Sequence, residues 1–328
     1  MFVPKISINY YRFEVGKNLS NNQLRKIMLT KALPWITLFY MGSVWGLSFS
    51  LGKIAVNLGG TPIGIAFWSS LFAGIILLIL TTLRRRYMKF SSKNLFLFII
   101  LAMIGTAIPS VCFYYAASKI PAGVLAITVT LVPILTYAFA TFLGLEKLAA
   151  RRVLGILLGA SAILFLVVPE TSLPDRSAVI WILVACISSV CYASENIVLA
   201  VRDLEGIGPI RMACGMSLIG TLLLGIVGLS TNNLFMIPIP FNNLSWTILG
   251  LAVINVTAYT LFIYTISQSG PLFASQVGYL VTLSGIFWGI LLFGESNSIW
   301  VWASLLTMLI GLAFVTPKKS DSKQEAVK

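Results

Sequence analysis

Apolar runs of about 20 residues recur along almost the whole 328-residue chain, separated by short polar segments. An α-helix needs a run of roughly 20 apolar residues to cross the hydrocarbon core of a bilayer. Charged residues make up only 10% of the chain, against about 25% in a typical soluble domain. The pattern therefore predicts an all-α, polytopic membrane protein and excludes an ordinary soluble domain.

Ten such spans are predicted. Several of them are bordered by proline, which suits the first turn of a helix because its missing N–H has no partner there. Pro34, Pro62, Pro121 and Pro209 each stand at the start of a span. The predicted spans are 34–56, 62–83, 95–117, 121–143, 152–168, 177–201, 208–230, 244–267, 271–293 and 297–316.

Lysine and arginine are distributed unevenly between the two sides that these spans define. With the N-terminus placed in the cytoplasm, 20 of the 23 basic residues fall in cytoplasmic segments, only Lys119 and Arg176 fall outside, and Lys53 lies within the first span. Cytoplasmic loops of membrane proteins carry such an excess. The bias predicts a multi-pass protein of the cell (inner) membrane with both termini cytoplasmic, and it explains the net charge of +13 without a nucleic-acid partner.

The two halves of the chain resemble each other in the order and spacing of their motifs. YYAASKIPAGVLA (114–126) corresponds to IYTISQSGPLFAS (263–275), while FLGLEKL corresponds to LFGESNS and pairs Glu146 with Glu295. A five-span unit repeated once must insert its second copy upside down, because five is odd. The predicted organisation is a cytoplasmic tail (1–33), two inverted five-helix repeats (34–168 and 177–316) and a second cytoplasmic tail (317–328).

Inverted repeats are a construction typical of secondary transporters, with the substrate bound near the midplane. The motifs GSVWGLSFSLGKIAV (42–56), GLEKL after the fourth span and FGES after the ninth, set in two five-helix halves, resemble the drug/metabolite transporter superfamily with two EamA-type domains. The resemblance covers 33–316 and implies ten helices, a central cavity between spans 1, 3 and 4 and spans 6, 8 and 9, and carriage of small metabolites. Pro133 of the fourth span has no counterpart in the ninth, which leaves the halves free to bend differently.

A carboxylate stands inside the sixth predicted span, in SSVCYASENIVLAVR (188–202). An ionisable group at the bilayer centre costs roughly 2.5–3.5 kcal/mol on insertion scales and is a functional candidate by default. Glu195 falls about six residues, or roughly 9 Å, from the cytoplasmic end of its span. Two interpretations stay open: a structural carboxylate in a wetted vestibule near Arg202 and Arg211, or a binding site for a substrate amine or a proton.

Lys53 is the other charge within a predicted span, near the outer end of the first one. The first and sixth spans run in opposite directions, so Lys53 and Glu195 are expected near opposite faces and not in direct contact. The long lysine stem can carry the ammonium to the interface. Alternatively, the ammonium binds an anionic group of the substrate.

Other polar and aromatic side chains lie at similar depth. An amide in hydrocarbon must find a partner, so these groups are expected to face the bundle interior, where packing between helices is the alternative to substrate binding. Together with Glu195 and Lys53, the predicted cavity lining is Trp45, Ser48, Tyr115, Tyr192, Asn196, Asn255, Gln276 and Tyr279.

The sequence offers no residue set for enzymatic chemistry. It contains no histidine, its four cysteines lie in apolar runs without a CxxC pair, and it has no GxSxG elbow. GLSFSLGKI (46–54) misses the spacing of a phosphate loop and has Ile54 in place of serine or threonine. We expect no enzyme activity, no cofactor and no metal; the expected partners are a small-molecule substrate and the lipid bilayer.

Three glycine pairs with small-xxx-small spacing allow close helix approach. They are Gly42/Gly46, Gly155/Gly159 and Gly285/Gly289. Packing within one bundle is favoured over dimerisation, and both a monomer and a homodimer stay open.

The predicted function is a secondary transporter (permease) that moves a small organic metabolite, such as an amino acid, vitamin or drug-like solute, across the cell membrane by alternating access. The alternatives are a non-transporting membrane sensor or scaffold, and a passive channel whose flux would not saturate. Clustered polar residues at matched depth in both halves favour a carrier.

Overall fold

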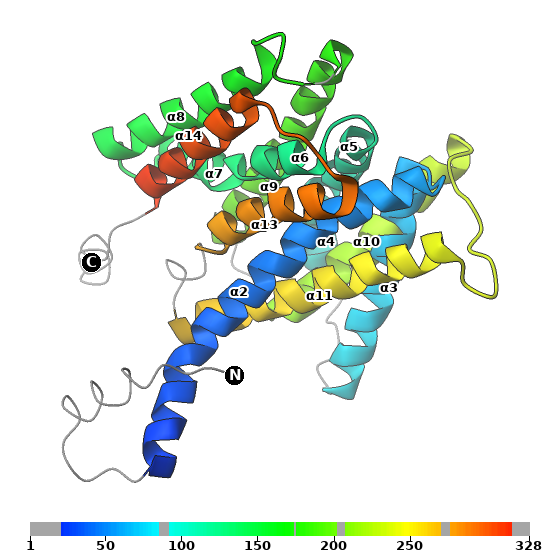
Figure 1. The fold of residues 1–328 in the computed structure, drawn as a ribbon. Helices are drawn as coiled ribbons and strands as arrows, with labels where there is room; N and C mark the ends of the chain where they lie inside the picture. Colours follow the sequence, from blue (N-terminus) through cyan, green and yellow to red (C-terminus); the bar gives the residue numbers. More distant parts are fainter. Residues whose placement is uncertain (1–20, 85–91, 174, 202–206, 270–275, 317–328) are drawn as a thin grey trace.

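The computed structural model describes residues 21–84, 92–173, 175–201, 207–269 and 276–316. Within these ranges the chain is helical, without a strand, and its helices form ten spans at the places predicted from the sequence (Figure 1). In chain order they are α2 (Asn21–Asn57); α3 (Pro62–Leu83); α4 (Ser92–Ala102), η1 (Met103–Ala107) and α5 (Ile108–Ala117); α6 (Ala122–Val129) and α7 (Leu131–Phe142); α8 (Ala150–Val167); η2 (Arg176–Ala178) and α9 (Val179–Val201); α10 (Pro209–Ser230); α11 (Asn243–Ser269); α13 (Val277–Phe293); and α14 (Ile299–Val315).

The first span begins earlier than expected. Pro34 lies inside α2, which already starts at Asn21, so the prediction that this proline begins the helix is wrong. Pro62 and Pro209 do occupy the first turns of α3 and α10, and Pro121 stands in the N-cap position of α6.

The two halves bend differently, as the unmatched Pro133 suggested. The third span contains a π-helical turn, η1, directly before Pro109, and the fourth span breaks at Thr130, between α6 and α7. A proline removes the N–H that would bond to the carbonyl four residues earlier, which favours such irregularities. The corresponding stretches of the second half, in α11 and α13, are regular α-helix.

Packing between the halves is reciprocal, as expected for two copies related by a pseudo-two-fold axis. The first span packs against the ninth and eighth (α2 with α13 and α11), and the sixth packs in the same way against the fourth and third (α9 with α6, α7 and α5). The remaining spans pair with their own counterparts, α3 with α10 and α8 with α14 (Figure 1).

The two repeat-related glutamates lie at opposite ends of the fourth span. Glu146 follows the C-terminal end of α7, whereas Glu295 accepts hydrogen bonds from the N–H groups of Ala122 and Gly123, at the N-terminal end of α6. Equivalent positions of the two halves therefore sit at opposite ends of the bundle, which is what an inverted repeat requires.

The glycine pairs pack within the bundle. A Cβ atom on Gly46 of α2 would collide with Ser284 of α13, and one on Gly155 of α8 would lie 2.7 Å from the carbonyl oxygen of Gly311 in α14. Because these contacts involve backbone, only glycine lets the helix pairs approach so closely.

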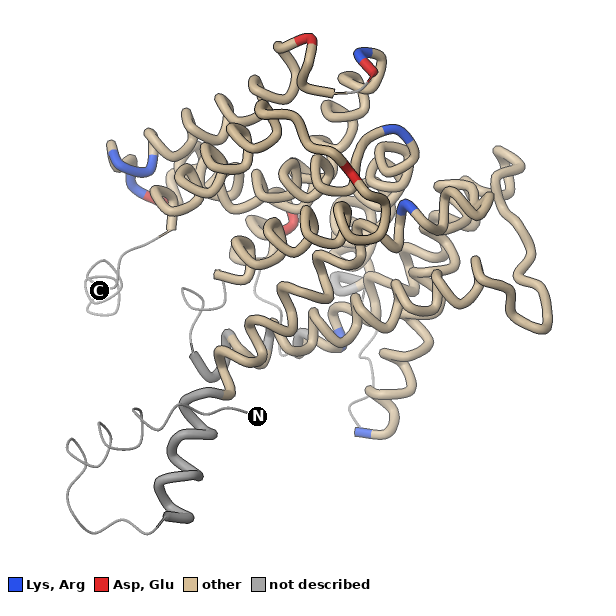
Figure 2. The backbone as a smooth tube through the Cα atoms, in the orientation of Figure 1, with Lys and Arg blue, Asp and Glu red and all other residues tan. Residues whose placement is uncertain are grey.

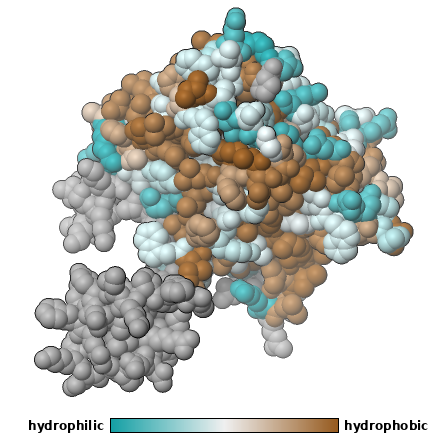
Figure 3. Space-filling view, viewed as in Figure 1, coloured by the Kyte–Doolittle hydropathy of each residue, from teal (hydrophilic) through white to brown (hydrophobic). Residues whose placement is uncertain are grey.

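The outward faces of the helices are apolar. Large hydrophobic side chains such as Phe39, Leu222 and Leu306 are exposed, and hydrophobic surface runs across the visible face in Figure 3. Lysine, arginine, aspartate and glutamate are sparse along the helices and stand mostly near helix ends (Figure 2). Seven helices in the described ranges are long and apolar enough to cross a membrane, while α13 and α14 are shorter apolar helices. The chain is a polytopic membrane protein.

Candidate functional site

Glu195 is a buried carboxylate on the inner side of α9, with a side chain that is 9% exposed. It faces Gly105 in the π-helical turn of the first half: a Cβ atom on Gly105 would lie 2.6 Å from the glutamate Cδ and 2.6 Å from the Cε of Met216. Within the described part of the chain, Glu195 forms no hydrogen bond or ion pair, with Arg211 or with any other residue. Arg202 lies outside the described residues.

A buried carboxylate without a protein partner is expensive, because burial disfavours its charged form. Such groups in membrane spans are typically retained for a ligand or a proton. The π-helical turn opposite supports this interpretation, since π-bulges are frequent at functional sites.

The inward face of α9 opens beyond Ala193. Four residues on one stripe of this helix are buried, namely Ile182, Ala185, Ser189 and Ala193. Asn196 continues the same stripe at the helical repeat of 3.6 residues, yet it is exposed, and its amide donates a 3.1 Å hydrogen bond to Thr136 of α7. The buried stripe therefore ends at Ala193, and Asn196 is accessible at the surface of the protein.

The same feature occurs on α11. Asn255 is exposed although it lies on the face that carries the buried residues Leu251, Ala252 and Ala258. Tyr259 follows one turn later on this face, and its phenol lies within electrostatic range of the Glu195 carboxylate. Of these two residues, Tyr259 lies near Glu195 of α9.

Tyr192 completes the group around the carboxylate. It precedes Glu195 by less than one turn of α9, and its phenol also lies within electrostatic range of the Glu195 carboxylate. The candidate site therefore combines the Glu195 carboxylate with the phenols of Tyr192 and Tyr259, and the Asn196 amide follows one position later on α9. It can offer a negative charge, hydrogen-bond donors and acceptors, and aromatic faces to a small organic solute.

On the other side of Glu195, α9 is fastened to the first half. Ser188 Oγ donates to the carbonyl oxygen of Pro109 at 2.8 Å, and Ser189 Oγ donates to that of Thr128 at 2.8 Å. All these groups are buried. Two residues after Thr128, the hydroxyl group of Thr130 forms a buried hydrogen bond with that of Thr282 in α13. The space around Asn196 is thereby closed toward the N-terminal end of α9.

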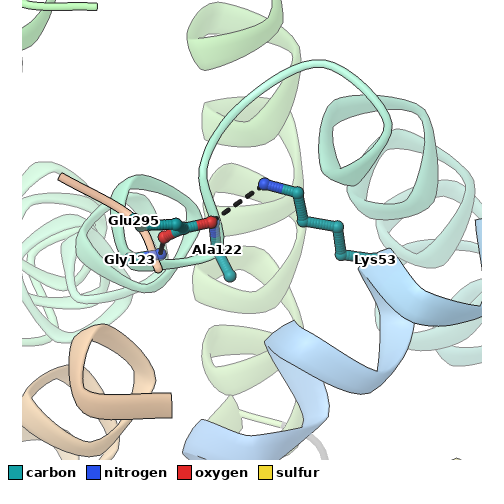
Figure 4. Close-up of polar contacts among 4 residues, drawn as sticks. All are labelled: Lys53, Ala122, Gly123 and Glu295. Carbon is teal, nitrogen blue, oxygen red and sulfur yellow. Dashed lines mark hydrogen bonds and ion pairs between the residues drawn. The ribbon is translucent and has the colours of Figure 1, made fainter. Parts of the chain in front are cut away.

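Lys53 lies at that closed end and has a protein partner. Its Nζ is 2.9 Å from Oε1 of Glu295 and 5.0 Å from the centre of the Phe293 ring (Figure 4). The structure thus pairs Lys53 with a glutamate, but with Glu295 and not with Glu195. Binding of an anionic substrate group by Lys53 stays a prediction that requires this pair to open.

Three further predicted residues lie apart from Glu195. Trp45 packs against Phe262, with ring centres 5.7 Å apart, and Ser48 donates to the Trp45 carbonyl oxygen at 2.6 Å. Tyr115 stacks on Trp181 at 6.3 Å between ring centres. The ring contacts of Trp45 and Tyr115 are packing between helices, which was the alternative to binding, whereas the Ser48 hydrogen bond lies within α2.

Gln276 and Tyr279 line a separate, open groove between the start of the first span and α13. Its volume is about 820 Å³ and its wall is mostly aromatic and aliphatic, including Trp35, Phe39 and Leu280. The structure therefore distributes the ten predicted residues over several places. Tyr192, Glu195 and Asn196 follow one another closely on α9, and Asn255 lies on α11.

Sequence reasoning missed three contributors. Gly105 makes room for the carboxylate, Thr136 holds the Asn196 amide, and Glu295 binds Lys53. The sequence did draw attention to Glu295, because the repeat pairs it with Glu146. No signal connected Gly105 or Thr136 to α9, since those contacts depend on how spans three, four and six cross.

Comparison with known proteins agrees with this architecture. A crystal structure of a protein shares 15% sequence identity over 88% of this chain and 96% of its own chain, with a TM-score of 0.56, which supports the fold alone. No curated protein matches the sequence. The profile of the EamA-like transporter family matches residues 33–168 and 179–316, one match for each half. The chain therefore belongs to the EamA-like transporter family.

Proposed function

We propose that this protein is a secondary transporter that moves a small organic solute across the cell membrane by alternating access, with both termini in the cytoplasm. The observation that carries the proposal is Glu195, a buried carboxylate without a partner among the described residues, followed on α9 by the exposed amide of Asn196. The proposal does not need an enzymatic step, a cofactor or a metal.

Reciprocal packing supports the alternating-access part. Each half supplies the same helix contacts to the other, so the two halves can exchange their arrangements and expose a central site to each side in turn. In the arrangement described above, the site opens beside Asn196 and is closed beside Lys53. With the termini in the cytoplasm, this arrangement faces inward.

Glu195 supplies charge selectivity in this proposal. In its ionised form it binds the amine of a cationic or zwitterionic solute, while Tyr192 and Tyr259 contact the uncharged part of the solute. In its protonated form it exchanges a proton for the solute. Both roles need a carboxylate at this place, and both end when the carboxylate becomes an amide.

The test is solute flux in vesicles that contain the purified protein. Saturable exchange of radiolabelled solutes is measured with a panel of cationic, zwitterionic and neutral amino acids and amines, at several pH values. We expect saturable flux for at least one amine, and we expect the Glu195→Gln variant to lose at least tenfold in flux or to lose its dependence on pH.

Glu146→Gln is the control for the same chemical change at a glutamate outside the helices, which is paired with Arg152 at 3.0 Å. It should transport as the unaltered protein does. Flux that never saturates would indicate a channel. A complete absence of flux for the panel would favour the scaffold, and unchanged transport by Glu195→Gln at every pH would make the carboxylate structural.

A further inference from the structure

Glu295 uses both carboxylate oxygens to join three elements. Oε1 accepts from the Lys53 ammonium at 2.9 Å and from the Ala122 N–H at 2.7 Å, and Oε2 accepts from the Gly123 N–H at 3.2 Å (Figure 4). The two N–H groups belong to the first turn of α6, where no helical carbonyl can satisfy them and the helix dipole favours a negative charge.

All three donors come from the first half of the chain, whereas Glu295 comes from the second. The carboxylate is 8% exposed, so its contacts are made largely out of water. Charge-assisted hydrogen bonds of this kind are about twice as strong as neutral ones. We name the contact set of Lys53, Ala122, Gly123 and Glu295 the Glu295 latch.

The latch depends on a close approach between α13 and α6. A Cβ atom on Gly289 would lie 2.5 Å from Oε2 of Glu295 and 3.3 Å from the Gly123 nitrogen. Just beneath, a Cβ atom on Gly285 would lie 2.5 Å from the Cβ of Ala126. Because α13 carries glycine at both positions, the Glu295 carboxylate can settle against the start of α6.

A transporter whose halves rock against each other must separate them at this end. The first and ninth spans and the fourth and ninth spans meet here, and the latch ties α2 and α6 to the segment that follows α13. Opening this end would draw Glu295 away from Lys53 and from both N–H groups at once. No other ion pair between two described residues joins the halves.

We propose that the Glu295 latch is the gate of the outer end, and that it sets how much of the protein stays closed to the outside. This inference rests on the proposed function for its physiological meaning, but the gate itself is a property of the folded chain. In this proposal Glu295 holds the outer end closed by binding Lys53 and the start of α6, and the outer end opens when these contacts break.

The experiment measures access from the outer side without any substrate. Ser50 lies one turn deeper than Lys53 on α2, is fully buried, and its hydroxyl has no hydrogen-bond partner, so Ser50→Cys is a conservative probe. In a variant whose four native cysteines are replaced, the rate at which a membrane-impermeant maleimide labels this probe from outside reports the open fraction.

We expect Glu295→Gln to raise that labelling rate at least tenfold, since an amide cannot accept from Lys53 and from both N–H groups. Lys53→Met should raise it less, because the N–H groups still hold the carboxylate. Gly289→Ala should raise it as well, because the added methyl group displaces the carboxylate without changing any charge. Glu295→Asp should fall between the unaltered protein and Glu295→Gln.

Glu146→Gln is the control and should leave labelling from outside unchanged. Equal labelling rates in Glu295→Gln, Gly289→Ala and the unaltered protein would overturn the gate, even where solute flux is normal. Conversely, faster labelling in a protein that transports no solute of the panel would keep the gate and reject the proposed function. Circular dichroism of each variant in detergent confirms that the helices are retained.

Discussion

Glu295 and Glu146 occupy equivalent positions in the two repeats, but they do different things. Glu295 is nearly buried and binds Lys53 and the start of α6, all in the other half. Glu146 is 38% exposed and pairs with Arg152, which belongs to its own half. At one end of the bundle an ion pair therefore joins the two halves. At the other end the equivalent glutamate forms an ion pair within its own half.

The two ends of the structure therefore differ because of its conformational state as well as because of its sequence. Two inverted copies with identical contacts at both ends would be closed at both ends and could not admit a solute. Here the closed end carries the cross-half ion pair and the hydroxyl bonds of Ser188 and Ser189, while Asn196 is exposed toward the other end. An alternating-access carrier needs this inequality in each of its open states.

The largest effect is expected from replacing the two glutamates, which should contribute differently to the free energy of unfolding. Glu295→Gln should lower the free energy of unfolding by about 3 kcal/mol, because it leaves Lys53 beside an uncharged group in a poorly hydrated place. Glu146→Gln should cost about 1 kcal/mol, because the Glu146 carboxylate is 38% exposed and water can solvate Arg152 when the charge is removed. Denaturant titration in mixed micelles measures both, and equal losses would remove the distinction.

A smaller effect on stability, but a large one on transport, is expected at Gly105. The Cβ atom of Gly105→Ala would meet the flexible ends of Glu195 and Met216, so the side chains should shift at modest cost while the carboxylate leaves its place. Solute exchange should fall at least tenfold. Gly278→Ala is the control, since its Cβ atom would meet only Leu312, at an ordinary 3.5 Å. Normal exchange by Gly105→Ala would show that transport does not depend on the position of the Glu195 carboxylate.

The smallest effects are expected for two substitutions on α9, one at the buried Ser189 and one at the exposed Asn196. Ser189→Ala removes a buried hydrogen bond to the Thr128 carbonyl and should cost about 1 kcal/mol. Asn196→Ala removes an exposed bond to Thr136 and should cost less than about 0.5 kcal/mol. The same titration measures both variants, and a larger loss at Asn196 would mean that this part of α9 is packed and not open.

The sequence was sufficient to predict the ten spans, because each follows from local apolar length and helix signals. It was also sufficient to predict Glu195 as a notable residue, since a charge in an apolar run is visible without a structure. The start of the first span was misplaced because Pro34 is tolerated inside a helix that begins at Asn21. That tolerance depends on the helical sequence before the proline.

The partner of Lys53 could not be predicted from the sequence. Glu295 is 242 positions away, and the contact depends on how closely α13 and α6 approach at Gly289. The repeat paired Glu295 with Glu146 but contained no information on which of them faces the other half. Likewise, the exposure of Asn196 and Asn255 depends on the state in which the two halves meet.

The central claim is that the two halves lie upside down relative to each other in the membrane. Leu145 and Ser296 are exposed residues beside Glu146 and Glu295, and each can be replaced by cysteine in a protein without its native cysteines. Side-specific labelling in intact cells and in inverted vesicles should place Leu145→Cys in the cytoplasm and Ser296→Cys outside. Labelling of both residues from the same side would contradict the inverted repeat, and with it the carrier.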